Sequence, residues 1–97
     1  MSLTAITVNF TYKRTSGSNA AGTVRFVPKS PYTDGSTIEE RTPQTVTLVN
    51  GAGSVVLEVE PPSTQFYVTE SIVDSPPHTY LITVSSATTP VALGSLM

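Results

Sequence analysis

An alternation of apolar and polar residues with a period of two runs through most of this chain and limits what it can fold into. Ile6, Val8, Phe10 and Tyr12 fall on one face of the first segment, with polar residues between them. This is the pattern of a strand with one buried face. No segment of useful length repeats with the 3.6-residue period of an amphipathic helix. The chain is therefore predicted to be all-β.

Turn residues divide the alternating pattern into short strands. Eight prolines and six glycines interrupt it at intervals of about ten residues, as in β-sandwiches. Asn50-Gly51 is the strongest hairpin signal, because both residues tolerate a positive φ. The proline-rich stretch 28–43 is predicted to be an irregular excursion with a short strand near Ile38. Further strands are expected at 6–12, 23–27, 45–49, 54–59, 66–72 and 79–84, which gives a six- to seven-stranded antiparallel β-sandwich.

The length of the chain indicates a single domain. Its 97 residues, 38% of them hydrophobic, can bury one modest core. Charged residues make up only 12%, about half the share of roughly 25% in an ordinary soluble domain. We therefore expect one domain over residues 1–97, ending in an apolar C-terminal tail at 90–97.

Charge and hydropathy argue against several partners. The net charge is −2, and only Lys13 and Arg14 are adjacent among five scattered cations, whereas nucleic-acid binding needs clustered cations. No apolar run approaches the roughly 20 residues of a membrane span. The N-terminus has neither the basic nor the apolar region of a signal peptide. We expect no nucleic-acid partner, no membrane, and synthesis in a cytoplasm.

The residues that carry chemistry are sparse and poorly placed for it. His78 is the only histidine, cysteine is absent, and no Gly-x-Ser-x-Gly turn or phosphate loop occurs. Glu58 and Glu60 are expected on one solvent face of a strand, and Asp34-Gly35 is better explained as a turn than as part of a calcium site. We therefore predict no catalytic, cofactor-binding or metal-binding residues and no enzymatic activity.

Glu70 lies in a more specific context. The segment Phe66-Tyr67-Val68-Thr69-Glu70 resembles the glutamate-bearing strand of pilin-type prealbumin-like modules of Gram-positive surfaces. In those modules the glutamate assists an isopeptide bond between a first-strand Lys and a last-strand Asn or Asp. Lys13 could be the first partner, but no Asn or Asp follows Asp74. The resemblance thus implies the fold and not the crosslink.

A series of motifs follows in one order over nearly all of residues 5–96: Gly22-Thr23-Val24-Arg25-Phe26-Val27-Pro28, Pro31, Val46-Thr47-Leu48, Asn50-Gly51, Tyr67-Val68-Thr69-Glu70, Tyr80-Leu81-Ile82-Thr83-Val84 and Val91-Ala92-Leu93. In this order the motifs resemble a domain of virion proteins in phages that infect actinobacteria. That family implies a prealbumin-like or immunoglobulin-like sandwich without catalytic residues. It further implies a bacteriophage structural protein, most simply a capsid decoration protein on the outside of the shell. A minor tail protein and a carbohydrate-binding or adhesion module are the alternatives.

Three segments are candidates for contacts in such an assembly. The two terminal segments either tie subunits to one another and to the shell, or merely complete the core. Similarly, Tyr32 is either an exposed contact or a cover for the core. The expected partners are the major capsid protein or tail proteins and further copies of the chain, a trimer being one arrangement, with a weak glycan contact left open. The candidate residues are Leu3, Ile6, Pro31, Tyr32, Val91, Leu93 and Leu96.

Overall fold

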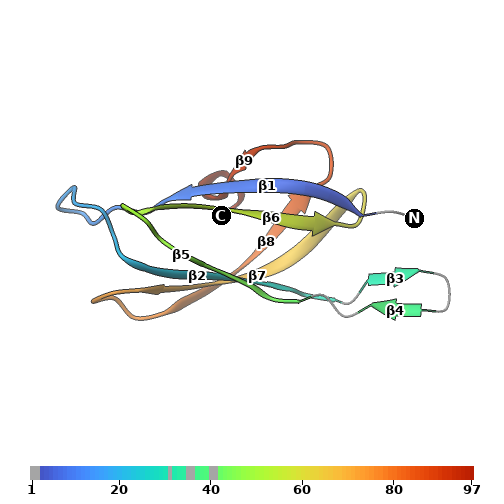
Figure 1. The fold of residues 1–97 in the computed structure, drawn as a ribbon, viewed down its shortest axis with the longest axis horizontal. Helices are drawn as coiled ribbons and strands as arrows, with labels where there is room; N and C mark the ends of the chain where they lie inside the picture. Colours follow the sequence, from blue (N-terminus) through green and yellow to red (C-terminus); the bar gives the residue numbers. More distant parts are fainter. Residues whose placement is uncertain (1–2, 31, 35–36, 40–41) are drawn as a thin grey trace.

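The computed structural model of the chain describes residues 3–30, 32–34, 37–39 and 42–97, and these form a structure of β-strands joined by turns (Figure 1). One short 3₁₀ helix lies near the C-terminal end of the described part. The elements are β1 (Thr4–Thr11), β2 (Gly22–Pro28), β3 (Tyr32–Asp34), β4 (Thr37–Glu39), β5 (Gln44–Thr47), β6 (Ala52–Val59), β7 (Ser63–Ile72), β8 (His78–Ser85), β9 (Val91–Ala92) and the 3₁₀ helix η1 (Leu93–Leu96).

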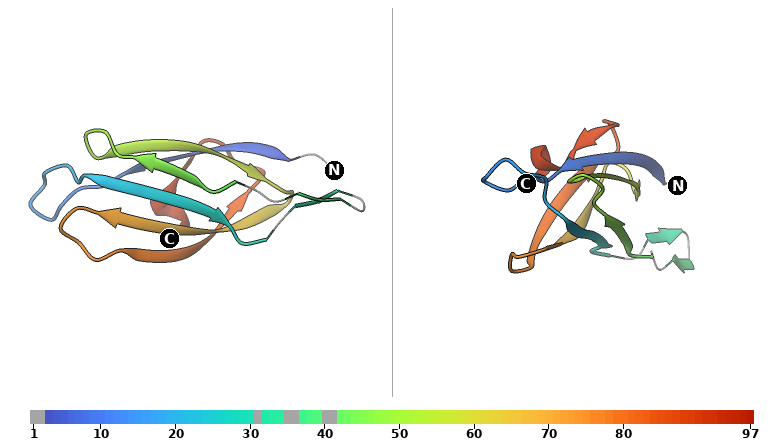
Figure 2. Two further views of the ribbon diagram at one scale, coloured as in Figure 1. Left: turned by 60° about the horizontal axis from the view of Figure 1, so that its bottom comes forward. Right: turned by 60° about the vertical axis from the view of Figure 1, so that its left-hand side comes forward.

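Two sheets face each other and confirm the predicted all-β sandwich (Figure 2). One sheet has the strand order β6-β1-β9 and the other the order β5-β2-β7-β8. The pairing within these sheets is antiparallel except at one place, where β9 runs parallel to β1, with Val8 beside Val91. β3 and β4 form a separate two-stranded sheet within the 28–43 excursion, beyond one end of the sandwich (Figure 1). The strand expected near Ile38 is β4.

The predicted turn at Asn50-Gly51 is present, but the strands on its two sides separate. Both residues have a positive φ, of 54° and 78°, and Val49 pairs with Ala52 around them. Beyond this pair β5 joins β2 while β6 joins β1, so the turn connects the two sheets. Leu48 marks the point of separation, because it is buried and its N–H donates to the Gly22 carbonyl at 2.9 Å.

The core lies between the sheets and follows the period-two pattern of the sequence. In β1 the buried residues are Ile6, Val8 and Phe10, and in β2 they are Val24 and Phe26. The rings of Phe10 and Phe26 meet across the sandwich with their centroids 5.7 Å apart. Each large apolar side chain that is fully buried contributes about 1.5–3 kcal/mol to folding. The remaining buried apolar residues of this cluster are Leu48, Val55, Leu57, Val59, Phe66, Val68, Ile82, Val84 and Leu93.

Gly22 is required at the start of β2. Its φ is +146°, a conformation that side chains rarely adopt, and β2 pairs there with the end of β7. A Cβ atom at this position would lie 2.2 Å from the Ser71 carbonyl oxygen. Only glycine lets the two backbones approach this closely.

The C-terminal segment closes one side of the sandwich. Leu93 is 1% exposed and belongs to the core, while Val91 and Leu96 are half-buried and pack against it. Upstream of β9, the Thr89 hydroxyl accepts a hydrogen bond from the Thr7 N–H at 3.0 Å. The segment 90–97 is thus an integral part of the fold. Within the described ranges there is no helix with the length and apolar character needed to cross a membrane.

Candidate functional site

The outer face of the four-stranded sheet carries an exposed row of apolar side chains across three strands. Val27 on β2 pairs with Tyr67 on β7, and Tyr67 pairs with Leu81 on β8. Tyr67 is 40% exposed and Leu81 45%, and Val27 is half-buried. We call Val27, Tyr67 and Leu81 the apolar row. Cross-strand neighbours on one face lie side by side, so the three form a continuous strip.

Polar residues border the apolar row on both sides. On one side the hydroxyls of Thr69 and Thr79 are hydrogen-bonded at 3.2 Å. On the other side the Lys29 ammonium donates to the Gln65 side-chain carbonyl at 3.2 Å. An apolar strip with a polar border is the usual composition of a protein-binding surface.

β8 forms an open edge of this sheet. It pairs with β7 in an unbroken register from Ser85 opposite Ser63 to His78 opposite Glu70. Its other side pairs with no strand in the part of the chain that the structure describes. The apolar row therefore ends at an exposed strand edge.

A buried carboxylate lies at one end of the inner face. Glu70 is 7% exposed, and its carboxylate accepts a hydrogen bond from the Tyr12 hydroxyl. Burial raises the pKa of the Tyr12 phenol well above its ordinary value, and the hydrogen bond and the negative charge of Glu70 raise it further. Charge repulsion from Glu70 also raises the pKa of the Tyr80 phenol. Tyr12 therefore remains a hydrogen-bond donor to Glu70 at neutral pH.

His78 and Tyr80 form an exposed aromatic pair beside this carboxylate. Their ring centroids are 6.4 Å apart and the ring planes are inclined by 22°. Tyr80 is 37% exposed. Both lie at alternate positions of β8 that face inward, with His78 opposite Glu70 and Tyr80 opposite Val68. The other sheet does not cover them, so they are exposed. His78 is the first residue of the edge strand β8.

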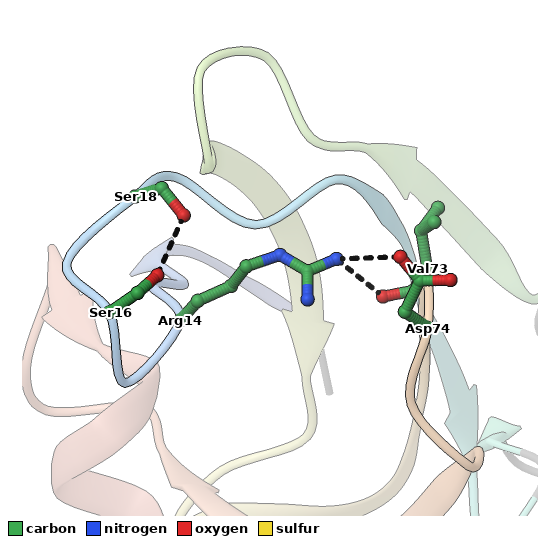
Figure 3. Close-up of polar contacts among 5 residues, drawn as sticks. All are labelled: Arg14, Ser16, Ser18, Val73 and Asp74. Carbon is green, nitrogen blue, oxygen red and sulfur yellow. Dashed lines mark hydrogen bonds and ion pairs between the residues drawn. The ribbon is translucent and has the colours of Figure 1, made fainter.

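An ion pair joins two loops at the end of the sandwich (Figure 3). The Arg14 guanidinium donates to the Asp74 carboxylate at 3.3 Å and to the Val73 carbonyl at 3.0 Å. Asp74 has a φ of +66°, and its side chain is 78% exposed. An exposed pair of this kind stabilises the fold by about 1 kcal/mol or less. It fixes the β1–β2 loop against the β7–β8 turn.

One shallow cleft opens near the other end, next to β7. Its volume is about 340 Å³. Its lining is polar and contains neither a histidine nor a buried nucleophile. The residues that line it are Lys29, Ser30, Glu60, Ser63, Thr64, Gln65 and Thr83.

The acidic residues singled out in the sequence do not gather. Glu58 is exposed on β6, and Glu60 follows the end of that strand and hydrogen-bonds through its backbone to Thr64. Lys13 is exposed, and it is Tyr12 that contacts Glu70. The described ranges contain no group of three or more His, Cys, Asp or Glu side chains that could hold a metal ion. Asp34 lies in β3, and Gly35 is outside the described residues.

The predicted contact residues divide between the core and its margins. Ile6 is fully buried and Leu93 nearly so, so both belong to the core, and a role for them in partner contact stays a prediction. Leu3, Val91 and Leu96 are half-buried. Pro31 lies outside the described residues, and Tyr32 is placed only as a backbone position of β3.

The apolar row and the β8 edge were not singled out from the sequence. A signal was present, since β8 contains no Asp, Glu, Lys or Arg over eight residues. A comparison of the chain with protein families, curated proteins and solved structures finds no match.

Proposed function

We propose that the protein is a structural component of a bacteriophage virion, most simply a capsid decoration protein that binds the outside of the shell. The motif order from Gly22 to Leu93 resembles actinobacteriophage virion domains, and this supports a phage particle as the assembly. The low share of charged residues, 12%, supports a surface that is packed against other proteins. The partner is then the major capsid protein.

The observation that carries the proposal is the apolar row on the outer face of the four-stranded sheet. Tyr67 and Leu81 expose a large part of their side chains to solvent and do not belong to the core. Tyrosine is enriched in protein interfaces because its ring buries a large area and its hydroxyl still makes hydrogen bonds. A broad strip of this kind fits the surface of another protein better than it fits a small molecule, which needs a concave site.

The mechanism would be recognition by shape. The apolar row would be desolvated against the shell, and the bordering threonines with Lys29 and Gln65 would make polar contacts at the rim. Contact of this kind cements neighbouring capsid subunits by adding buried area across their boundary.

Immunogold electron microscopy on purified virions, with an antibody against this chain, tests the location. Gold over the head supports a decoration protein, whereas gold confined to the tail moves the assignment to a minor tail protein. Virions without gold would contradict the virion proposal.

Binding to shells that lack the protein tests the surface. Tyr67→Ala should weaken binding at least tenfold, as truncation of a buried aromatic anchor costs about 2 kcal/mol or more. Val56→Ala is the matched control, because Val56 is 51% exposed on β6 in the other sheet. Equal affinities of the two variants would exclude the apolar row as the contact.

A second candidate is a carbohydrate-binding or adhesion module. The exposed His78–Tyr80 pair favours it, because sugars pack their C–H groups on aromatic faces. A glycan array with the protein and its Tyr80→Ala variant separates the candidates. Glycan binding that is lost in the variant would favour this second function.

A further inference from the structure

The backbone of β8 offers free hydrogen-bonding groups. The alternating direction of backbone hydrogen bonds along β7 and β8 shows which residues carry them. The Lys29 N–H donates to the Gln65 carbonyl at 3.0 Å, so Gln65 directs its backbone groups toward β2. Successive residues of a strand direct these groups to opposite sides. The even-numbered residues of β7 therefore bond to β8. The bond from the Ser86 N–H to the Pro62 carbonyl, at 3.0 Å, agrees with this phase.

It follows that the odd-numbered residues of β8 direct their N–H and C=O groups to the open side. These are Thr79, Leu81 and Thr83, whose side chains lie on the outer face of the sheet. No backbone hydrogen bond to the open side of these three residues occurs among the described residues. The open edge thus combines free backbone groups with the end of the apolar row.

β8 lacks the features that normally protect such an edge. Natural edge strands are kept short, carry charges or proline, contain a bulge, or are covered by a helix or loop. The helix η1 contacts β8, but Thr79, Leu81 and Thr83 remain exposed. β8 has eight residues, no Asp, Glu, Lys or Arg, no proline, and an unbroken register with β7. An unprotected edge of this length invites another strand.

The other edges of the two sheets are protected. β5 has four residues, and β9 has two. β6 is as long as β8, but it carries Glu58, and its Val56 carbonyl accepts a hydrogen bond from the Gln44 side-chain amide at 3.0 Å. Among these edges, β8 is the one left suited to strand addition.

We propose that β8 pairs antiparallel with β8 of a second copy, with Leu81 opposite the partner's Leu81 across a two-fold axis. An antiparallel pair of identical strands is self-complementary, so each copy supplies the groups that the other requires. Because β8 carries no Asp, Glu, Lys or Arg, two copies with a net charge of −2 meet without like charges in contact at the edge.

The register follows from the apolar row. With Leu81 on the axis, the row of one copy continues into the row of the other over both four-stranded sheets. Thr79 then lies opposite the partner's Thr83, which places two β-branched polar residues side by side. The two-fold axis is perpendicular to the sheet, so both apolar rows face the same side. The pairing does not depend on the proposed virion function, because it needs only the purified protein.

Cysteine crosslinking tests the register, and the chain has no cysteine of its own. In Leu81→Cys the two sulfur atoms would meet, since paired Cα atoms lie about 5.5 Å apart, within the range of a disulfide. Thr83→Cys is the matched control on the same strand and face. Its two copies would be four residues apart along the strand, about 13 Å, beyond the reach of a disulfide.

The expected result is a disulfide-linked dimer of Leu81→Cys under mild oxidation and none of Thr83→Cys. Equal or faster crosslinking of Thr83→Cys would overturn the register. Failure of both to crosslink, with a wild-type chain that sediments as a monomer from micromolar to millimolar concentration, would overturn the pairing.

Sedimentation velocity of lysine variants provides a second measurement. Leu81→Lys places two like charges next to each other on the axis and should weaken the dimer at least tenfold. Thr47→Lys, on the outer face of the opposite edge strand, should leave it unchanged. Circular dichroism verifies that both variants are folded. An unchanged dimer in Leu81→Lys, or a trimer in the wild type, would overturn the two-fold arrangement.

Discussion

Tyr12, directly after β1, donates a hydrogen bond from its phenol to the Glu70 carboxylate on β7, and so joins the two sheets of the sandwich. Glu70 is the buried charged residue in the described part of the chain. A buried carboxylate is costly unless it is hydrogen-bonded, and Tyr12 supplies such a bond.

Removal of this donor should destabilise the protein. Tyr12→Phe leaves the buried carboxylate without its phenol partner, so the free energy of unfolding should fall by about 1–3 kcal/mol. Urea denaturation measures it. Tyr67→Phe, which removes an exposed hydroxyl, should change stability by no more than about 0.5 kcal/mol. Equal effects of the two variants would show that the Tyr12 bond does not stabilise the sandwich.

Stability should decline at alkaline pH. In the folded state the pKa of Tyr12 lies well above its ordinary 10.0, mainly because of burial. Above pH 10 the unfolded chain therefore loses the phenol proton while the folded protein keeps it, which favours unfolding. The contribution of this group is complete below pH 10 and is lost progressively as the pH rises further.

Denaturation midpoints measured at a series of pH values check this expectation. Tyr12→Phe should show a shallower decline than the wild type above pH 10, because it lacks the group that titrates. Part of the decline should remain in the variant, since the pKa of Tyr80 is raised as well. Parallel curves for the two proteins would contradict the role of Tyr12.

Gly22 and Gly17 make a matched pair for testing a close backbone approach. Both have a positive φ, but a Cβ at Gly22 would collide with the Ser71 carbonyl, whereas Gly17 has open space. Gly17→Ala should cost about 1–2 kcal/mol from backbone conformation alone. Gly22→Ala should cost more than about 3 kcal/mol, because the β2–β7 contact must also shift. Thermal or urea unfolding compares them, and equal losses would contradict the close approach.

The C-terminal segment should contribute to the folding stability of the isolated protein, apart from any role in assembly. Leu93→Ala removes a buried side chain and should cost about 2–5 kcal/mol. Met97→Ala, at a side chain that is 54% exposed, should cost no more than about 0.5 kcal/mol. Deletion of 90–97 should accordingly lower the unfolding temperature of the isolated protein. An unchanged unfolding temperature would return these residues to a role in partner contact.

The strands were predictable from the sequence because each depends on local alternation. The face with Ile6, Val8, Phe10 and Tyr12 points inward as expected, and Asn50-Gly51 forms the expected turn. These signals lie within a few residues of one another, so they depend little on the rest of the chain.

The assignment of strands to sheets was not predictable in the same way. That β5 and β6 leave their common turn for different sheets depends on the partners β2 and β1, which lie far away in the sequence. The parallel pairing of β9 with β1 has the same origin. Local alternation specifies which face is buried and says nothing about which strand lies beside it.

The apolar row was not predicted from the sequence, for a related reason. Each of its residues lies on a different strand, at one of the outward-facing positions that are otherwise mostly polar. In the sequence, Val27, Tyr67 and Leu81 therefore look like isolated exposed residues. They form one surface only after the register brings them side by side. The inward assignment of Leu93 likewise required the position of η1 against the sheets.

The neighbours of β1 have a consequence for the order in which the protein forms. Val8 lies between Val55 on β6 and Val91 on β9, so the two strands beside the first one come from the middle and the end of the described chain. Contacts between distant segments close slowly, and sandwiches of this kind fold in about milliseconds to seconds. On the ribosome, β1 therefore stays unpaired until β6 is made, roughly 50 residues later, and it gains its second neighbour only with β9. Until then its apolar face is open to chaperones or to other nascent chains.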